Sequence, residues 1–292
     1  MSTYLLISFL LLSLIGMPLA IVFSFSGVIA LFLSDKIYLL NIIVQRLTNG
    51  MTQYVLIAIP FFVLAGQLMN SSEITQKIFK FANTIVGHIQ GGLGHTNVLA
   101  SIIFAGMSGT AVADAAGLGA IEIKVMKEKG YDLGFRDAIT VASSIIGPII
   151  PPSVPMVIYG SIAQASTGAL FLGGVIPGLL MGLSLMILVY FYAKKRNYFV
   201  ESRANFNEIW IAFKGAFLSL LTPIIIVGGI IFGIFTPTEA AVVASAYALI
   251  LGTLVYRTLS WDKFKEVVLD TIKTSSTIIF IIACASPFSW PL

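Results

Sequence analysis

The stretch Gly106-Met-Ser-Gly-Thr-Ala-Val-Ala-Asp-Ala-Ala-Gly-Leu-Gly119 decides how the rest of the sequence is interpreted, because it places one acid among small residues in an apolar chain. Between positions 100 and 120, 14 of 21 residues are Ala, Gly, Ser or Thr. Small residues let helix backbones approach closely within a membrane. An acid at that depth is costly, so Asp114 is a candidate functional residue.

The composition is that of a membrane protein. Of the 292 residues, 58% are hydrophobic and only 10% are charged, whereas a soluble domain carries about 25% charged residues. The apolar runs are about twenty residues long, which is the length that a spanning helix needs. We therefore expect an all-α, polytopic protein in a lipid bilayer. Its apolar segments cover residues 4–33, 53–70, 96–123, 137–165, 168–193, 208–234, 237–256 and 274–290.

The basic residues set the orientation of these segments. They are concentrated in three short loops, around 124–136, 194–203 and 257–265, and such loops lie in the cytoplasm by the positive-inside rule. On this layout 15 of the 17 Lys and Arg residues lie in the cytoplasm or at cytoplasmic helix ends. Segment 96–123 then begins and ends on one side, which predicts a re-entrant hairpin. The net charge of +4 follows from these loops and does not indicate nucleic-acid binding.

A second interruption, Gly147-Pro-Ile-Ile-Pro-Pro-Ser153, lies about forty residues further on. Its prolines lack the N–H group that a helix ladder needs, so segment 137–165 is expected to be a broken helix. The first half should end near Gly147 with free carbonyl groups. The second half should begin with Ser153 as its N-cap and Pro155 in its first turn.

Irregular backbone at membrane depth persists only when it is buried in protein or lines a polar cavity, so we expect the hairpin tip and the break to face each other. Carbonyl ends suit a cation, whereas helix N-termini suit a substrate carboxylate. Sodium is expected near Ser108, Asp114 and Gly147. Three simpler roles stay open: Asp114 could cap backbone N–H groups, Ser108 to Thr110 could serve only close helix packing, and the break could be a simple kink. The candidate sodium- and substrate-binding residues are Ser108, Gly109, Thr110, Asp114, Gly147, Pro148, Pro151, Pro152 and Ser153.

An enzyme is not expected. Gly106-Met-Ser-Gly109 matches the G-x-S-G of rhomboid proteases, whose serine needs a histidine base from a later helix. The only histidines, His88 and His95, precede Ser108. The sequence also lacks a Walker A loop and an H-E-x-x-H motif, so we predict no catalytic residue.

A weak internal repeat at an offset of 219 aligns Pro18 with Pro237 and Ser26 with Ser245. The predicted topology places the two copies in opposite orientations, as in inverted-repeat transporters. Residues 1–205 would form the first repeat, with the return helix at 168–193, and 206–292 would begin the second. Copies of residues 147–153 would fall at 366–372, so the second repeat is expected to be truncated.

Four stretches, taken together, resemble the large membrane subunit (M, DctM-like) of TRAP transporters, the tripartite ATP-independent periplasmic family. They are IPFFVLAG (59–66), GMSGTAVAD (106–114), GPIIPPS (147–153) and FTPTEAA (235–241). The resemblance covers the whole chain, except that family members continue to a second hairpin and a second break. Carried over to this sequence, residues 108–114 would be the first hairpin tip and 147–153 the first broken helix.

The resemblance implies a sodium-coupled importer of small organic acids in a bacterial inner membrane, moving by an elevator mechanism. Sodium ions would be coupling ions, with no other cofactor. The partners would be a small four-helix membrane subunit and a periplasmic binding protein. The substrate could be a dicarboxylate, a keto acid or sialic acid. Two alternatives remain: a sodium-coupled anion symporter that works alone, and a truncated membrane scaffold that transports nothing.

Overall fold

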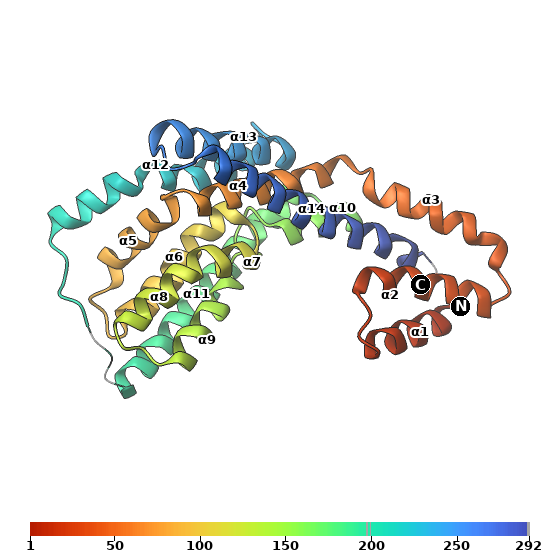
Figure 1. Ribbon diagram of the computed structural model, residues 1–292, viewed down its shortest axis with the longest axis horizontal. Helices are drawn as coiled ribbons and strands as arrows, with labels where there is room; N and C mark the ends of the chain where they lie inside the picture. Colours follow the sequence, from red (N-terminus) through yellow and green to blue (C-terminus); the bar gives the residue numbers. More distant parts are fainter. Residues whose placement is uncertain (197, 199, 291–292) are drawn as a thin grey trace. The chain divides into compact units, whose positions relative to one another are not determined.

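The computed structural model describes residues 1–196, 198 and 200–290, and every regular element among them is helical (Figure 1). This confirms the all-α prediction. The chain divides into two compact units, residues 1–57 with 272–292 and residues 58–271. The division follows contacts, so it does not test the predicted repeat boundary at 205.

The first unit contains helices from both ends of the chain. Gly16, with φ of +82°, separates α1 from α2, so the first apolar segment forms two helices. The rings of Phe9, Phe23 and Phe288 pack together with centroids 5.1 to 5.4 Å apart. Its elements are α1 (Ser2–Leu14), α2 (Leu19–Leu33), η1 (Ile37–Leu39), α3 (Leu40–Met51), η2 (Tyr54–Ile57) and the end of α14 (Trp261–Ser289).

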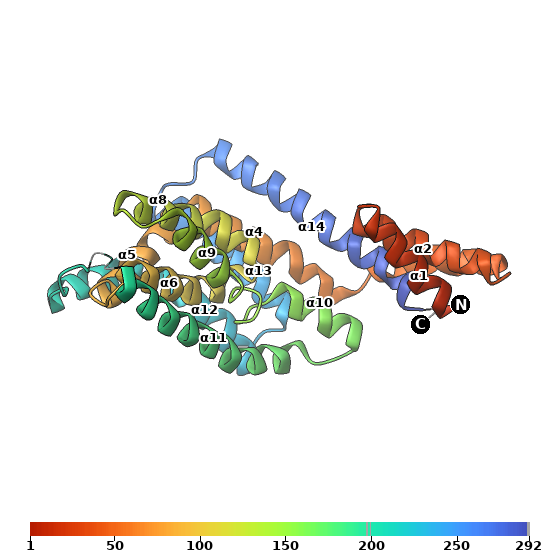
Figure 2. The ribbon, with the colours of Figure 1, turned by 90° about the horizontal axis from the view of Figure 1, so that it is seen from below.

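The second unit holds both predicted interruptions. In Figure 2, α11 runs beside α6 and α12. The elements are α4 (Ala58–Ser71), α5 (Ile74–Val86), α6 (Gly92–Ser108), α7 (Ala111–Ala113), η3 (Asp114–Leu118), α8 (Gly119–Glu128), α9 (Leu133–Ser144), α10 (Val154–Ala163), α11 (Thr167–Arg196), α12 (Phe206–Ile231), α13 (Pro237–Ile250), η4 (Leu251–Val255) and the start of α14.

Five helical stretches of the described chain are long and apolar enough to cross a membrane. All five overlap predicted apolar segments, whereas the arms of the hairpin and the halves of the broken helix are shorter. The chain is therefore a multi-pass membrane protein with two shorter, interrupted elements. The five stretches are Tyr54–Ser71, Thr167–Arg196, Phe206–Ile231, Pro237–Val255 and Trp261–Ser289.

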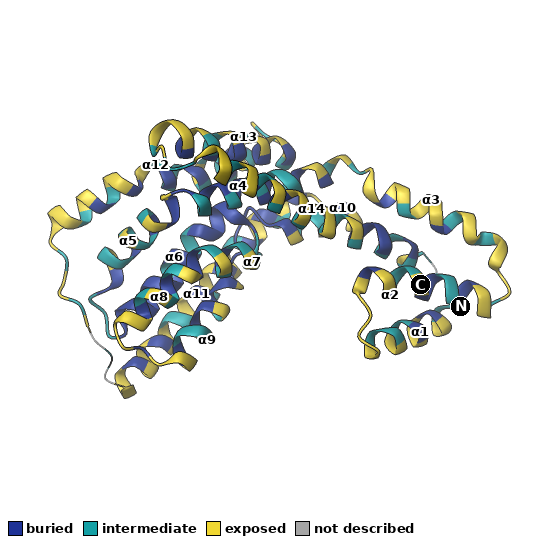
Figure 3. Ribbon diagram, viewed as in Figure 1, coloured by how far each residue is buried: buried dark blue, intermediate teal, exposed yellow. Residues whose placement is uncertain are grey.

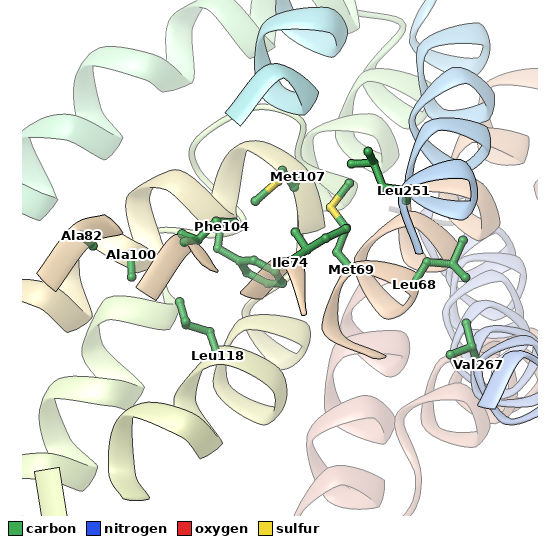
Figure 4. Close-up of a cluster of buried hydrophobic side chains, with 12 residues drawn as sticks. Leu68, Met69, Ile74, Ala82, Ala100, Phe104, Met107, Leu118, Leu251 and Val267 are labelled. Atoms are coloured by element: carbon green, nitrogen blue, oxygen red, sulfur yellow. The ribbon is translucent and has the colours of Figure 1, made fainter. Parts of the chain in front are cut away.

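The hairpin is anchored by a cluster of buried apolar side chains (Figure 4). Phe104 and Met107 of α6 contribute to it, together with Leu68 and Met69 of α4 and Ile74 of α5. By contrast, the long helices α11 and α12 carry many exposed residues (Figure 3). Helices in lipid associate through close van der Waals packing, so this cluster fixes the first arm of the hairpin against its neighbours.

Candidate functional site

The predicted hairpin is present, and its turn lies at Gly109. Helix α6 ends at Ser108, and α7, the π-helical η3 and α8 form the returning arm. The arms run antiparallel, since the Asn97 amide near the start of α6 lies 2.5 Å from Glu122 Oε2 in α8, at hydrogen-bond distance. Thr110 is the N-cap of the returning arm, because its hydroxyl accepts a hydrogen bond from Ala113 N at 3.2 Å.

Gly109 is required at the tip for two reasons. Its φ of +64° lies in the left-handed region, which favours glycine. A Cβ at this position would also lie 2.7 Å from the carbonyl oxygen of Pro152. The tip can therefore approach the break only because this residue has no side chain.

The broken helix has the predicted interruption. Helix α9 ends at Ser144, three residues before Gly147, because the backbone tightens into short turns. Gly147 N donates to Ser144 O at 3.0 Å in one of these turns. The prolines Pro148, Pro151 and Pro152 follow, between α9 and α10.

Helix α10 begins as predicted, with Ser153 as its N-cap and Pro155 in its first turn. The Ser153 hydroxyl accepts a hydrogen bond from Met156 N at 3.2 Å and donates one to Pro148 O at 2.5 Å. The same hydroxyl thus caps the second half of the helix and holds the chain that leads into it.

The two interruptions meet, as the sequence predicts. Val154 N donates a 3.1 Å hydrogen bond to Gly109 O, and a Cβ on Gly147 would lie 3.1 Å from Thr110 O. The first turn of α10 therefore has no vacant donor at Val154 or Met156, and Pro155 has none to offer. In this arrangement the meeting point is rich in carbonyl oxygens.

Near the hairpin tip, two polar side chains are buried without a hydrogen-bond partner among the described residues. They are Ser108, at 0% exposure, and Asp114, at 1%. The Ser101 hydroxyl of α6 lies beside the Asp114 carboxylate, but no backbone N–H group of the described residues reaches either carboxylate oxygen. Asp114 is therefore not a cap for local backbone. Its carboxylate faces α6, whereas Gly109 and Thr110 meet the break.

Several polar residues near the site were missed in the sequence. Asn70 of α4 donates a 2.9 Å hydrogen bond to Ala113 O, next to Asp114. Asn97 and Glu122 join the two arms of the hairpin. Each is an isolated polar residue in or beside an apolar segment, and that is the signal that could have identified it.

Away from the tip, Asp132 precedes α9 and connects it to the end of α11. Its carboxylate accepts hydrogen bonds from Tyr198 and Arg196, and another from Phe135 N at 3.0 Å as the N-cap of α9. The Tyr198 hydroxyl and then the Arg196 guanidinium lower the pKa of Asp132 to about 2. The carboxylate therefore stays ionised at any physiological pH.

Replacing Asp132 by asparagine (Asp132→Asn) is expected to lower the unfolding temperature slightly, because asparagine keeps the cap but loses the charge. A lowered folded-state pKa gives stability that is present above the unfolded value and is lost as the pH falls through about 2. The difference from wild type should thus be constant between about pH 5 and about pH 8. Thermal unfolding across that range checks this, and a difference that changes within it would contradict it.

The fold and the site define a polytopic helical membrane protein in which a hairpin tip meets a broken helix. Residues 6–292 match the family model of the tripartite ATP-independent periplasmic transporter, DctM component, and the chain belongs to this family. The family is one of transporter components, which confirms the prediction that the chain is not an enzyme.

Curated relatives agree with this assignment. The sialic acid TRAP transporter large permease protein SiaM of Vibrio cholerae is 49% identical over 275 residues, covering 94% of this chain and 64% of the relative. The 2,3-diketo-L-gulonate TRAP transporter large permease protein YiaN of Escherichia coli is 38% identical, covering 94% and 65%. The C4-dicarboxylate TRAP transporter large permease protein DctM of Pseudomonas aeruginosa is 39% identical, covering 89% and 60%. The chain thus spans less than two thirds of these relatives' length.

Proposed function

We propose that this chain forms the hairpin and broken-helix part of a permease that imports small organic acids with sodium. The observation that carries the proposal is the 3.1 Å hydrogen bond between Val154 N and Gly109 O, which joins the two interruptions. The three relatives described above are named for the transport of sialic acid, 2,3-diketo-L-gulonate and C4-dicarboxylates. All three are carboxylates, so we assign a carboxylate substrate to this chain.

Sodium is the coupling ion in this proposal, because hard cations prefer oxygen ligands. The tip and break supply carbonyl oxygens, together with the buried hydroxyl of Ser108. The buried carboxylate of Asp114 adds negative charge on the α6 side of the hairpin. An uncompensated acid in a membrane interior is costly, and a cation nearby would offset that cost.

The partners and the location belong to the same proposal. A small four-helix membrane subunit and a periplasmic binding protein would complete the transporter in the bacterial inner membrane. The hairpin and the broken helix would move together as an elevator, because the tip is hydrogen-bonded to the break.

The test is the sodium dependence of thermal unfolding in purified protein, with potassium at equal ionic strength as reference. At a sodium concentration ten times the dissociation constant, binding should stabilise the wild type by about 1.4 kcal/mol. Asp114→Asn should lose most of this sodium-specific rise. Asp262→Asn, a change at an exposed acid in the first turn of α14, should keep it.

A sodium-specific rise that is equal in wild type and Asp114→Asn would remove Asp114 from the site. No rise in the wild type would argue for a scaffold that transports nothing. Uptake of a labelled carboxylate into proteoliposomes, with and without a periplasmic binding protein, tests the transport step. Uptake without that protein would identify a symporter that works alone.

A further inference from the structure

A second polar cluster lies within the hairpin, away from its tip. It joins three elements: α6 through Asn97, α8 through Glu122, and α9 through Thr140 and Ser143. All four side chains are buried, and Glu122 is only 1% exposed. Asn97 Nδ2 lies 2.5 Å from Glu122 Oε2 and 2.8 Å from Thr140 Oγ1, and Asn97 Oδ1 lies 2.6 Å from Ser143 Oγ.

This cluster continues the polar face on which Asp114 lies. On α6, Asn97 and Ser101 are four residues apart and share one face of the helix. Ser101 lies beside Asp114, and Asn97 contacts Glu122. The two arms of the hairpin therefore contact each other at two places, and each contact includes a buried acid.

Neither acid has a basic partner in these contacts. Oε1 of Glu122 accepts no hydrogen bond from the described residues, and the charged group that acts on Glu122 is Asp114, another acid. The other titratable groups on the neighbouring helices are His95 of α6 and the Arg136–Asp137 pair of α9, joined at 3.4 Å. On α8 itself, the exposed groups are Lys124, Lys127 and Glu128.

A buried carboxylate ion with a single amide donor is strongly disfavoured. A neutral acid avoids that penalty. The 2.5 Å between Glu122 Oε2 and the Asn97 amide is also within the range of O–H···O hydrogen bonds, so the neutral acid can occupy this contact.

We propose that Glu122 is a proton-holding site, in which the neutral acid donates a hydrogen bond to the amide oxygen of Asn97. The oxygen and nitrogen of an asparagine amide exchange places by a half-turn. After that half-turn, the oxygen accepts from Glu122 and, over 2.8 Å, from Thr140. The amide nitrogen then donates to Ser143 Oγ over 2.6 Å. The Ser143 hydroxyl in turn donates to Thr140 O at 3.1 Å.

The proton makes Glu122 a positioning residue for the candidate site. Through Asn97, both hairpin arms are tied to α9, the half of the broken helix that leads to Gly147. Without the proton, two buried carboxylate ions would face one interior, which is costly. The proton therefore stabilises the packing of the hairpin against α9 by removing one of these charges.

The experiment compares Glu122→Gln and Glu122→Ala with wild type in lipid nanodiscs, with Glu128→Gln as the exposed control on the same helix. Glutamine has the shape of the neutral acid and can donate the same hydrogen bond. Glu122→Gln should therefore unfold near the wild-type temperature, and Glu122→Ala well below it.

The wild-type infrared spectrum should contain the carbonyl stretch of a protonated carboxylic acid. Glu122→Gln should lack that band, and Glu128→Gln should keep it.

The pH profile gives an independent readout. A proton bound in the folded state gives stability that is lost as the pH rises. The stability of the wild type relative to Glu122→Gln should therefore fall as the pH rises above the value at which an unfolded glutamic acid ionises, about 4.3.

Three results would overturn the proposal. They are a Glu122→Gln protein that is as unstable as Glu122→Ala or does not fold, no carboxylic acid band that depends on Glu122, and equal pH profiles of wild type and Glu122→Gln. Loss of the sodium-specific stabilisation in Glu122→Gln, together with a missing acid band, would instead make Glu122 a cation ligand. The sodium dependence of wild type and of Asp114→Asn is measured separately, so the two proposals can fail independently.

Discussion

Gly109→Ala is expected to lower the unfolding temperature and to abolish the sodium-specific stabilisation. A residue with a Cβ in the left-handed conformation costs about 1–2 kcal/mol. The new methyl group would also meet Pro152 O at 2.7 Å, so the tip must withdraw from the break. That withdrawal would lengthen the hydrogen bond from Val154 N to Gly109 O. Thermal unfolding with sodium and with potassium measures both effects.

Gly130→Ala is a closely matched control for this change. Gly130 has a φ of +78°, and nothing lies within 4 Å of its Cβ position. The control therefore carries the same backbone strain without the steric contact. It should lose some stability and keep the full response to sodium. If both variants lose the same stability and both respond to sodium, the close contact with Pro152 has no role in the site.

Phe104→Ala is expected to have the largest effect on stability. Phe104 is 0% exposed and lies in the cluster that anchors the first hairpin arm (Figure 4). Removing a buried phenylalanine ring leaves a cavity and costs about 3–5 kcal/mol. The unfolding temperature should fall steeply, and the hairpin should become more accessible to hydrogen exchange.

Phe191→Ala is the control, since Phe191 lies in α11 and is 66% exposed. This change removes the same ring from a surface that leaves no internal cavity, so its effect should be small. Equal losses in the two variants would mean that the cluster around Phe104 does not hold the hairpin.

The interruptions could be predicted from the sequence because single residues impose them on the backbone. Gly109 permits a left-handed turn, and the prolines between 148 and 152 remove donors from the helix ladder. Local capping was predictable for the same reason. The sequence Thr236-Pro-Thr-Glu239 has the spacing of a capping box. The structure has this box at the start of α13, with Thr236 N donating to the Glu239 carboxylate at 2.7 Å.

What the sequence did not reveal depends on contacts between distant residues. The hydrogen bond from Asn97 to Glu122 spans 25 positions, and the one from Asn97 to Thr140 spans 43. No local pattern pairs such residues. The start of α14 was missed for a different reason. The helix begins at Trp261, 13 residues before the predicted apolar segment at 274. Its first turns contain charged residues, so a search for apolar runs does not detect them.

The first turn of α10 limits how a carboxylate can bind. A carboxylate could reach the amide of Val154 only by displacing the carbonyl of Gly109, because that amide is already engaged. An acid at this helix end would therefore compete with the hairpin tip for one donor. A substrate that binds there would separate the hairpin tip from the broken helix.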